Sequence, residues 1–124
     1  RHDQRHVARA AQEGIVFSLQ YGMEVMAGMG MEMKTVRAGY ANMFLSPLFA
    51  ETFATTTGCR VELYNTDGAM GAARAAGYGS GSYPDLRSCF KGMNVVRTYE
   101  PSGDAGALRD AYAQWKAELS QLIG

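Results

Sequence analysis

The start of the chain repeats apolar side chains every three or four residues, which is the spacing of one face of an α-helix. The pattern predicts a helix over residues 6–27, ended by Gly28. Gly14 and Gly22 lie inside it, where each costs about 1 kcal/mol relative to alanine, so we expect this helix to pack closely against a neighbour. The predicted buried stripe is Val7, Ala11, Ile15, Leu19, Met23 and Met26.

Strand and helix patterns alternate through the middle of the chain. Residues 33–38 and 60–64 are predicted strands, because each is a short apolar-leaning run and the second alternates inward and outward positions. A helix is predicted between them, with Ser46 as its cap, Pro47 in its first position and Gly58 at its end.

A helix rich in small residues follows the second strand. Its predicted cap is Thr66 or Asp67, and Gly77 is its predicted end. The remaining predicted elements are a loop at 77–85, a helical turn at 86–91, a short extended piece at 94–99 and a last helix from Asp104.

The alternation of strands and helices predicts an α/β fold with parallel strands. Only two strands are well marked, and an isolated parallel pair cannot cover itself. We therefore expect an incomplete sheet with packed helices, whose first strands lie upstream of this chain. The chain also opens directly in a helical pattern at Arg1 without a methionine, as if it were cut from a longer protein or processed.

Composition narrows the classes of protein. The chain of 124 residues is 47% hydrophobic and 19% charged, which is typical of a globular domain. Its formal net charge is zero, so nothing favours binding to a nucleic-acid backbone, and it has no apolar run long enough to span a membrane. Cys59 and Cys89 are interpreted as reduced thiols, which favours a cytoplasmic protein.

The clearest candidate site follows the first predicted strand. Ligands of open α/β sheets bind outside the carboxyl ends of the strands. Gly39 directly follows the strand and allows a close backbone approach or a positive φ. Asn42 offers both a donor and an acceptor, and the helix that starts at Ser46 has free N–H groups. From spacing alone, both a plain structural turn and a ligand site remain open.

The other candidates are interpreted as structural. Residues 65–68 close the second strand in the same way, as a helix cap and turn. Residues 77–82, GYGSGS, follow a helix and lack the GK[ST] ending of a phosphate loop. His2 and His6 have the spacing of metal ligands but no third partner, so we expect solvated side chains. No catalytic triad or base is visible, and three aspartates are interpreted as caps or turn residues: Asp67, Asp85 and Asp104.

Four stretches, taken in order, resemble conserved segments of one family. They are ARAAQEGIVFSLQYGMEVMAGMG, VRAGYANMFLSPLFAETFATTTG, VELYNTDGAMGAARAAGYGSGSYPDL and VVRTYEPSGDAGALRDAYAQWKAEL. The second is similar to the family's adenosine segment, a glycine-containing turn followed by Ser-Pro-Leu and a helix. Together they cover almost the whole chain and resemble the C-terminal part of the FGGY carbohydrate kinases, most closely the xylulokinase branch.

The resemblance implies a ribonuclease H-like, actin-like ATPase fold in two lobes, with ATP between them. Residues 1–124 would form the C-terminal segment of the nucleotide-binding lobe. The whole enzyme would transfer the γ-phosphoryl group of ATP, with Mg²⁺, to a ketopentose such as D-xylulose. The catalytic aspartate and the sugar-binding residues would lie upstream, so this segment alone is expected to be inactive. A homodimer is a state that the sequence leaves open.

The resemblance also implies roles for individual residues. Gly39 would lie against the phosphates or ribose, Asn42 near the adenine or ribose, and Gly71 would let its helix approach the nucleotide or the adjoining turn. Tyr40 stands where many relatives have a second glycine, and its ring could stack on adenine or narrow the site. Leu45 replaces a frequent lysine, and Asn42 is similar to the glycerol kinase branch. Another FGGY kinase, or a non-catalytic actin-like interaction module, therefore remains an alternative.

Overall fold

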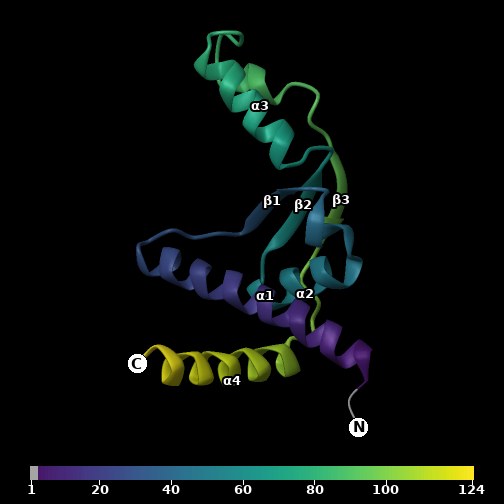
Figure 1. The fold of residues 1–124 in the computed structure, drawn as a ribbon, viewed down its shortest axis with the longest axis vertical. Helices are drawn as coiled ribbons and strands as arrows, with labels where there is room; N and C mark the ends of the chain where they lie inside the picture. Colours follow the sequence, from purple (N-terminus) through teal and green to yellow (C-terminus); the bar gives the residue numbers. More distant parts are fainter. Residues whose placement is uncertain (1–2) are drawn as a thin grey trace.

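The computed structural model describes residues 3–124, and its α/β architecture agrees with the prediction (Figure 1). The elements are α1 (Gln4–Gly28), β1 (Thr35–Gly39), the 3-10 helix η1 (Asn42–Leu45), α2 (Pro47–Thr57), β2 (Arg60–Tyr64), α3 (Gly68–Gly79), the 3-10 helix η2 (Arg87–Phe90), β3 (Val95–Tyr99) and α4 (Gly106–Ile123).

The sheet has three strands in the order β1-β2-β3. β1 and β2 are parallel, as predicted, and Gly39 stands opposite Tyr64 in their register. The extended piece predicted at 94–99 is a true strand, and it pairs antiparallel to β2, so the expectation of two parallel strands alone was wrong. Within the described residues, β1 and β3 are open edges, which agrees with an incomplete sheet.

The helices are distributed unevenly around this sheet. Figure 1 shows α1, α2 and α4 gathered at one side, whereas α3 extends away from the body beyond the ends of β1 and β2. None of the residues of α3 is buried. The core lies between α1, α2 and β2 and consists of Val16, Phe17, Phe49, Phe53, Ala54, Val61 and Leu63.

Local capping signals place the helix ends. Ser46 accepts a hydrogen bond from the N–H of Phe49 and Pro47 opens α2, while Gly58 ends it with a left-handed φ of 69°. These three predictions are confirmed. Asp67 caps α3 through a hydrogen bond of 2.8 Å from the N–H of Met70 to its Oδ1.

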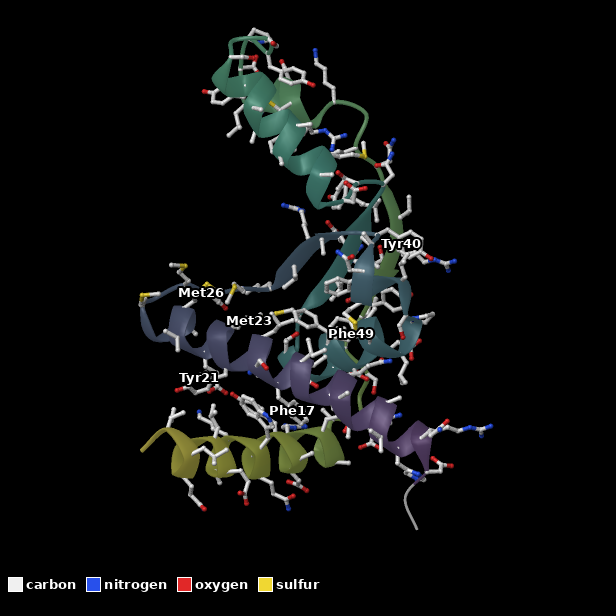
Figure 2. All side chains as sticks on the ribbon, in the orientation of Figure 1. Phe17, Tyr21, Met23, Met26, Tyr40 and Phe49 are labelled. Carbon is white, nitrogen blue, oxygen red and sulfur yellow. The ribbon has the colours of Figure 1, made fainter. Side chains whose placement is uncertain are left out.

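The predicted buried stripe of α1 is wrong at most of its positions. Val16 and Phe17 are buried, while Val7, Ile15 and Leu19 are 65%, 42% and 44% exposed. The helix carries apolar residues on adjoining faces. The face that becomes buried is the one that packs against aromatic residues of α4, far away in the sequence. The ring centroid of Phe17 lies 5.6 Å from that of Tyr112 and 6.1 Å from that of Trp115. Figure 2 shows Phe17 between α1 and α4.

Two expectations about glycines are also corrected. A Cβ atom at Gly14 or Gly22 would have no neighbour within 4 Å among the described residues, so close packing does not explain either glycine. Gly77 is not the end of α3, which continues to Gly79. A Cβ atom at Gly77 would lie 2.6 Å from the ring of Tyr83, so this glycine makes room for the loop that folds back onto α3.

Candidate functional site

The carboxyl ends of β1 and β2 meet at one edge of the sheet because the two strands are parallel. The N–H of Tyr40 donates a 2.8 Å hydrogen bond to the carbonyl oxygen of Tyr64. A Cβ atom at Gly39 would lie 3.1 Å from the carbonyl carbon of Thr66, closer still to its oxygen, and 3.3 Å from Cα of Asp67. Gly39 is therefore required for a close approach to the backbone of the turn after β2, and its predicted contact with a ligand stays a prediction.

A cavity of about 420 Å³ opens beside this contact, on the side of α1. Its size falls within the usual range of small-molecule sites. Five of its lining residues come from α1, β1, η1 and the turn before α3: Ile15, Leu19, Gly39, Asn42 and Asp67. The others are Ala38, Ala41, Met43, Phe44, Phe49 and Gly68.

The apolar wall of the cavity explains the partial exposure of two residues of α1. Ile15 and Leu19 are 42% and 44% exposed because their side chains border the cavity instead of the core. The Phe44 ring stands edge-to-face against Phe49 and Phe53, with centroid distances of 5.2 and 5.6 Å. These contacts hold the Phe44 ring in place where it lines the cavity. Such a wall suits the face of a planar, uncharged ring.

The polar side chains of the lining are Asn42 and Asp67. Asn42 has a φ of 52°, in the left-handed region that asparagine tolerates better than most residues. The Oδ1 atom of Asp67 accepts the cap hydrogen bond, and among the described residues no hydrogen bond reaches its Oδ2. The lining residues include no lysine, arginine or histidine. The cavity therefore offers hydrogen bonds to a polar ligand but no positive charge to a phosphate.

The structure brings together two of the four residues expected at the site, Gly39 and Asn42. Tyr40 lies beside β3 in Figure 2, and the guanidinium carbon of Arg97 is 6.0 Å from the centre of its ring. Gly71 lies on α3, and its Cβ position has no neighbour within 4 Å. Neither Tyr40 nor Gly71 lines the cavity, and their roles stay predictions.

Asp67 lines the cavity but was not predicted as a site residue, because its position before a helix was explained by a cap alone. The signal available was the repetition of a strand, a turn and a helix start at 36–47 and again at 60–68. Parallel pairing of the two strands brings these two turns to the same place. That pairing, together with the contact at Gly39, puts Asp67 into the wall of the cavity.

Two other cavities contain fewer of the residues expected at the site. One of about 540 Å³ lies across the Gly39 contact, where Arg37, Tyr64 and Phe90 contribute to its lining. It is larger, but it contains only one of the expected site residues, and Nε of Arg37 is already engaged by Glu62 at 3.1 Å. A cavity of about 390 Å³ at the end of α1 contains none of the expected residues. The cavity beside Asn42 is therefore the candidate site.

The described residues show no metal centre. Within residues 3–124, no group of three or more histidine, cysteine, aspartate or glutamate residues could hold an ion. His2 lies outside the described residues, and His6 Nδ1 is 2.9 Å from the carboxylate of Asp3. Cys59 and Cys89 are unpaired, as predicted, and both are buried. None of the described helices has the length and apolar character that crossing a membrane requires.

The fold matches that of a known enzyme class. A solved structure, the xylulose kinase from Rhodospirillum rubrum, aligns with a TM-score of 0.75 over 98% of this chain and 25% of that one, at 19% sequence identity. This match confirms the predicted actin-like ATPase fold. No family model matches the sequence.

Curated relatives give the family at the level of sequence. The xylulose kinase of Bacillus subtilis is 36% identical over 92 residues, which are 71% of this chain and 18% of the relative. That of Staphylococcus epidermidis is 30% identical over 116 residues, 90% of this chain and 23% of the relative. The glycerol kinase of Pseudothermotoga lettingae is 29% identical over 123 residues, 96% of this chain and 24% of the relative.

These relatives make the chain a homologue of the FGGY carbohydrate kinases, matching their C-terminal segment, as the sequence motifs predicted. Xylulose kinases and glycerol kinases both occur among the matches. The chain spans less than a quarter of the length of the first two of these curated relatives.

Proposed function

We propose that this chain is the adenosine-binding part of an ATP-dependent sugar kinase. The observation that carries the proposal is the cavity at the carboxyl ends of β1 and β2. It combines an apolar wall from Ile15 and Leu19 with the polar side chains of Asn42 and Asp67. This is the composition expected of a site for a nucleoside, which has flat apolar faces and a few polar edges.

The charge of the cavity favours the nucleoside over the phosphates. A phosphate beside Asp67 would meet a like charge, and the lining residues supply no cation to offset it. The base and ribose therefore enter the cavity, and the phosphates point out of it. This assigns Gly39 to the ribose side, as one of the two roles that the resemblance implied for it.

The whole kinase would use the bound nucleotide in a phosphoryl transfer. A sugar hydroxyl oxygen bonds to the γ-phosphorus of ATP, the bond from that phosphorus to the bridging oxygen breaks, ADP leaves and a base takes the hydroxyl proton. Mg²⁺ would offset the phosphate charge, and within the described residues no group of three or more histidine, cysteine, aspartate or glutamate side chains forms a site for it. The role of this chain is to bind and orient the nucleoside.

D-xylulose is the substrate that the relatives favour, since two of those named above are xylulose kinases. Glycerol is the second candidate, because glycerol kinases also match, over almost the whole chain. The proposal includes a cytoplasmic location, where ATP is available. Steady-state assays of the complete kinase with D-xylulose and with glycerol decide between the two: the kcat/KM for D-xylulose should be the larger, and a larger value for glycerol would contradict the assignment.

Calorimetric titration of the complete kinase that contains this chain tests the nucleoside site. Adenosine should bind measurably without the phosphates, because the cavity lining offers its contacts to the base and the ribose. Asn42→Gly keeps the left-handed backbone free of strain and removes the amide, so it should weaken adenosine binding about three- to tenfold. Binding of ATP without measurable binding of adenosine would show a phosphate site instead, and no binding of either would refute the proposal.

A further inference from the structure

The second turn of the site, after β2, contains a carboxylate whose hydrogen bonds are only half used. We propose that Asp67 binds the ribose hydroxyl groups of the nucleoside, so that this chain distinguishes ribonucleosides from their deoxy forms. The inference rests on the proposed function and assigns a role to a residue that otherwise acts only as a helix cap.

The position of Asp67 is fixed from two directions. Its Cα lies 3.3 Å from the point where a Cβ atom of Gly39 would stand, so its backbone is held against the end of β1. Its Oδ1 accepts the N–H of Met70 at 2.8 Å, which fixes the carboxylate over the first turn of α3. The residue is exposed to solvent, and among the described residues it forms no ion pair within 4.0 Å and no hydrogen bond to its Oδ2.

An ionised carboxylate only accepts hydrogen bonds, so its ligand must donate. In a nucleoside the 2′ and 3′ hydroxyl groups are adjacent donors, and one carboxylate can accept from both. Carboxylates bind ribose hydroxyls in this way in dinucleotide-binding proteins of an unrelated α/β fold. Asn42, which both donates and accepts, suits the edge of a base, which presents both kinds of group. Asp67 therefore binds the ribose hydroxyls, and Asn42 binds the edge of the base.

The cap function of Asp67 has to be separated from this role. Asp67→Ser serves that purpose, because serine caps helices about as well as aspartate but is shorter and uncharged. Asp85→Ser is the matched control. Asp85 stands just before η2, its Oδ1 accepts the N–H of Ser88 at 2.7 Å in the same i to i+3 pattern, and it does not line the cavity.

The test is a calorimetric titration of the complete kinase with adenosine and with 2′,3′-dideoxyadenosine, which lacks both hydroxyls. The loss of a hydrogen bond to a charged group should weaken adenosine binding to the Asp67→Ser variant by about tenfold or more. Binding of dideoxyadenosine should be unchanged by Asp67→Ser and already weak in the unsubstituted kinase. Asp85→Ser should alter neither affinity.

Two results would overturn the inference while leaving the nucleoside site in place. The first is that Asp67→Ser weakens both ligands equally, which would show an effect of the cap on the whole cavity. The second is that it weakens neither, which would show that the ribose is bound elsewhere. A third result, no binding of either ligand to the unsubstituted complete kinase, would refute the proposed function and this inference with it.

Discussion

Replacing Gly39 by alanine adds one methyl group at the tightest point of the candidate site. The new Cβ atom would stand 3.1 Å from the carbonyl carbon of Thr66 and 3.3 Å from Cα of Asp67, and nearer still to the Thr66 oxygen. All three are backbone atoms, so no side chain can rotate out of the way. The turns after β1 and β2 must separate, which strains the hydrogen bond from Tyr40 to Tyr64.

The expected cost is that of an overpacked interior, about 1–3 kcal/mol. With a urea m-value of about 2 kcal/mol/M, a loss of 2 kcal/mol lowers the unfolding midpoint by about 1 M. The adenosine affinity should fall as well, because both turns line the cavity. Urea unfolding followed by far-UV circular dichroism measures the first effect, and calorimetry measures the second.

Gly22→Ala is the matched control within the same chain. A Cβ atom at Gly22 has no neighbour within 4 Å among the described residues, so the substitution should stabilise α1 by about 1 kcal/mol. The two Gly→Ala changes are thus expected to have opposite signs. If Gly39→Ala were neutral or stabilising, the close approach of the two turns would not exist, and the geometry of the site would be wrong.

Further predictions concern the helices around the core. Phe17→Ala should lower the free energy of unfolding in urea by about 3–5 kcal/mol, and Val7→Ala by less than about 0.5 kcal/mol, because Phe17 is buried and Val7 is exposed. The hydrogen bond from Lys116 lowers the pKa of Glu24, so its stabilisation is full above the ordinary carboxyl pKa and is lost as the pH falls through the lowered value. Glu24→Gln should remove this acid-side slope, which is worth less than about 1 kcal/mol because the pair is partly exposed. Burial raises the pKa of Tyr112 from 10.0 to about 12, which favours its neutral form, so stability should fall between those pH values in the unsubstituted chain and stay level there after Tyr112→Phe.

Features that depend on neighbouring residues could be predicted from the sequence. The cap at Ser46, the proline after it and the left-handed glycine at 58 act within a few residues of one another, and all three were placed correctly. β2 was also predicted with its true bounds, because its alternation reflects one buried and one exposed face.

Features that depend on distant contacts were missed. The buried face of α1 is the one that packs against Tyr112 and Trp115, which lie at the other end of the chain. The direction of β3 depends on its pairing with β2. Gly39 and Asn42 could be proposed from their place after a strand, whereas Asp67 became a candidate only when the contact at Gly39 joined the two turns.

The resemblance of four segments to FGGY kinases predicted a nucleotide site, which the spacing of apolar and polar residues alone did not. Strand and helix spacing alone left both a plain structural turn and a ligand site open. The relatives and the structural match support membership of the FGGY family. The cavity lined by Gly39 and Asn42 then favours the ligand-site interpretation of the turn after β1. Xylulose kinases and glycerol kinases both match this segment, which agrees with the expectation that the sugar-binding residues lie upstream of it.

The most direct test of the nucleoside site is to map bound adenosine on the isotope-labelled complete kinase by amide chemical shifts. Within this chain, the largest shifts are expected on Gly39, Asn42, Asp67 and Gly68 and on the α1 residues Ile15 and Leu19. Shifts centred instead on Tyr64, Phe90 and Met93, across the Gly39 contact, would contradict this expectation.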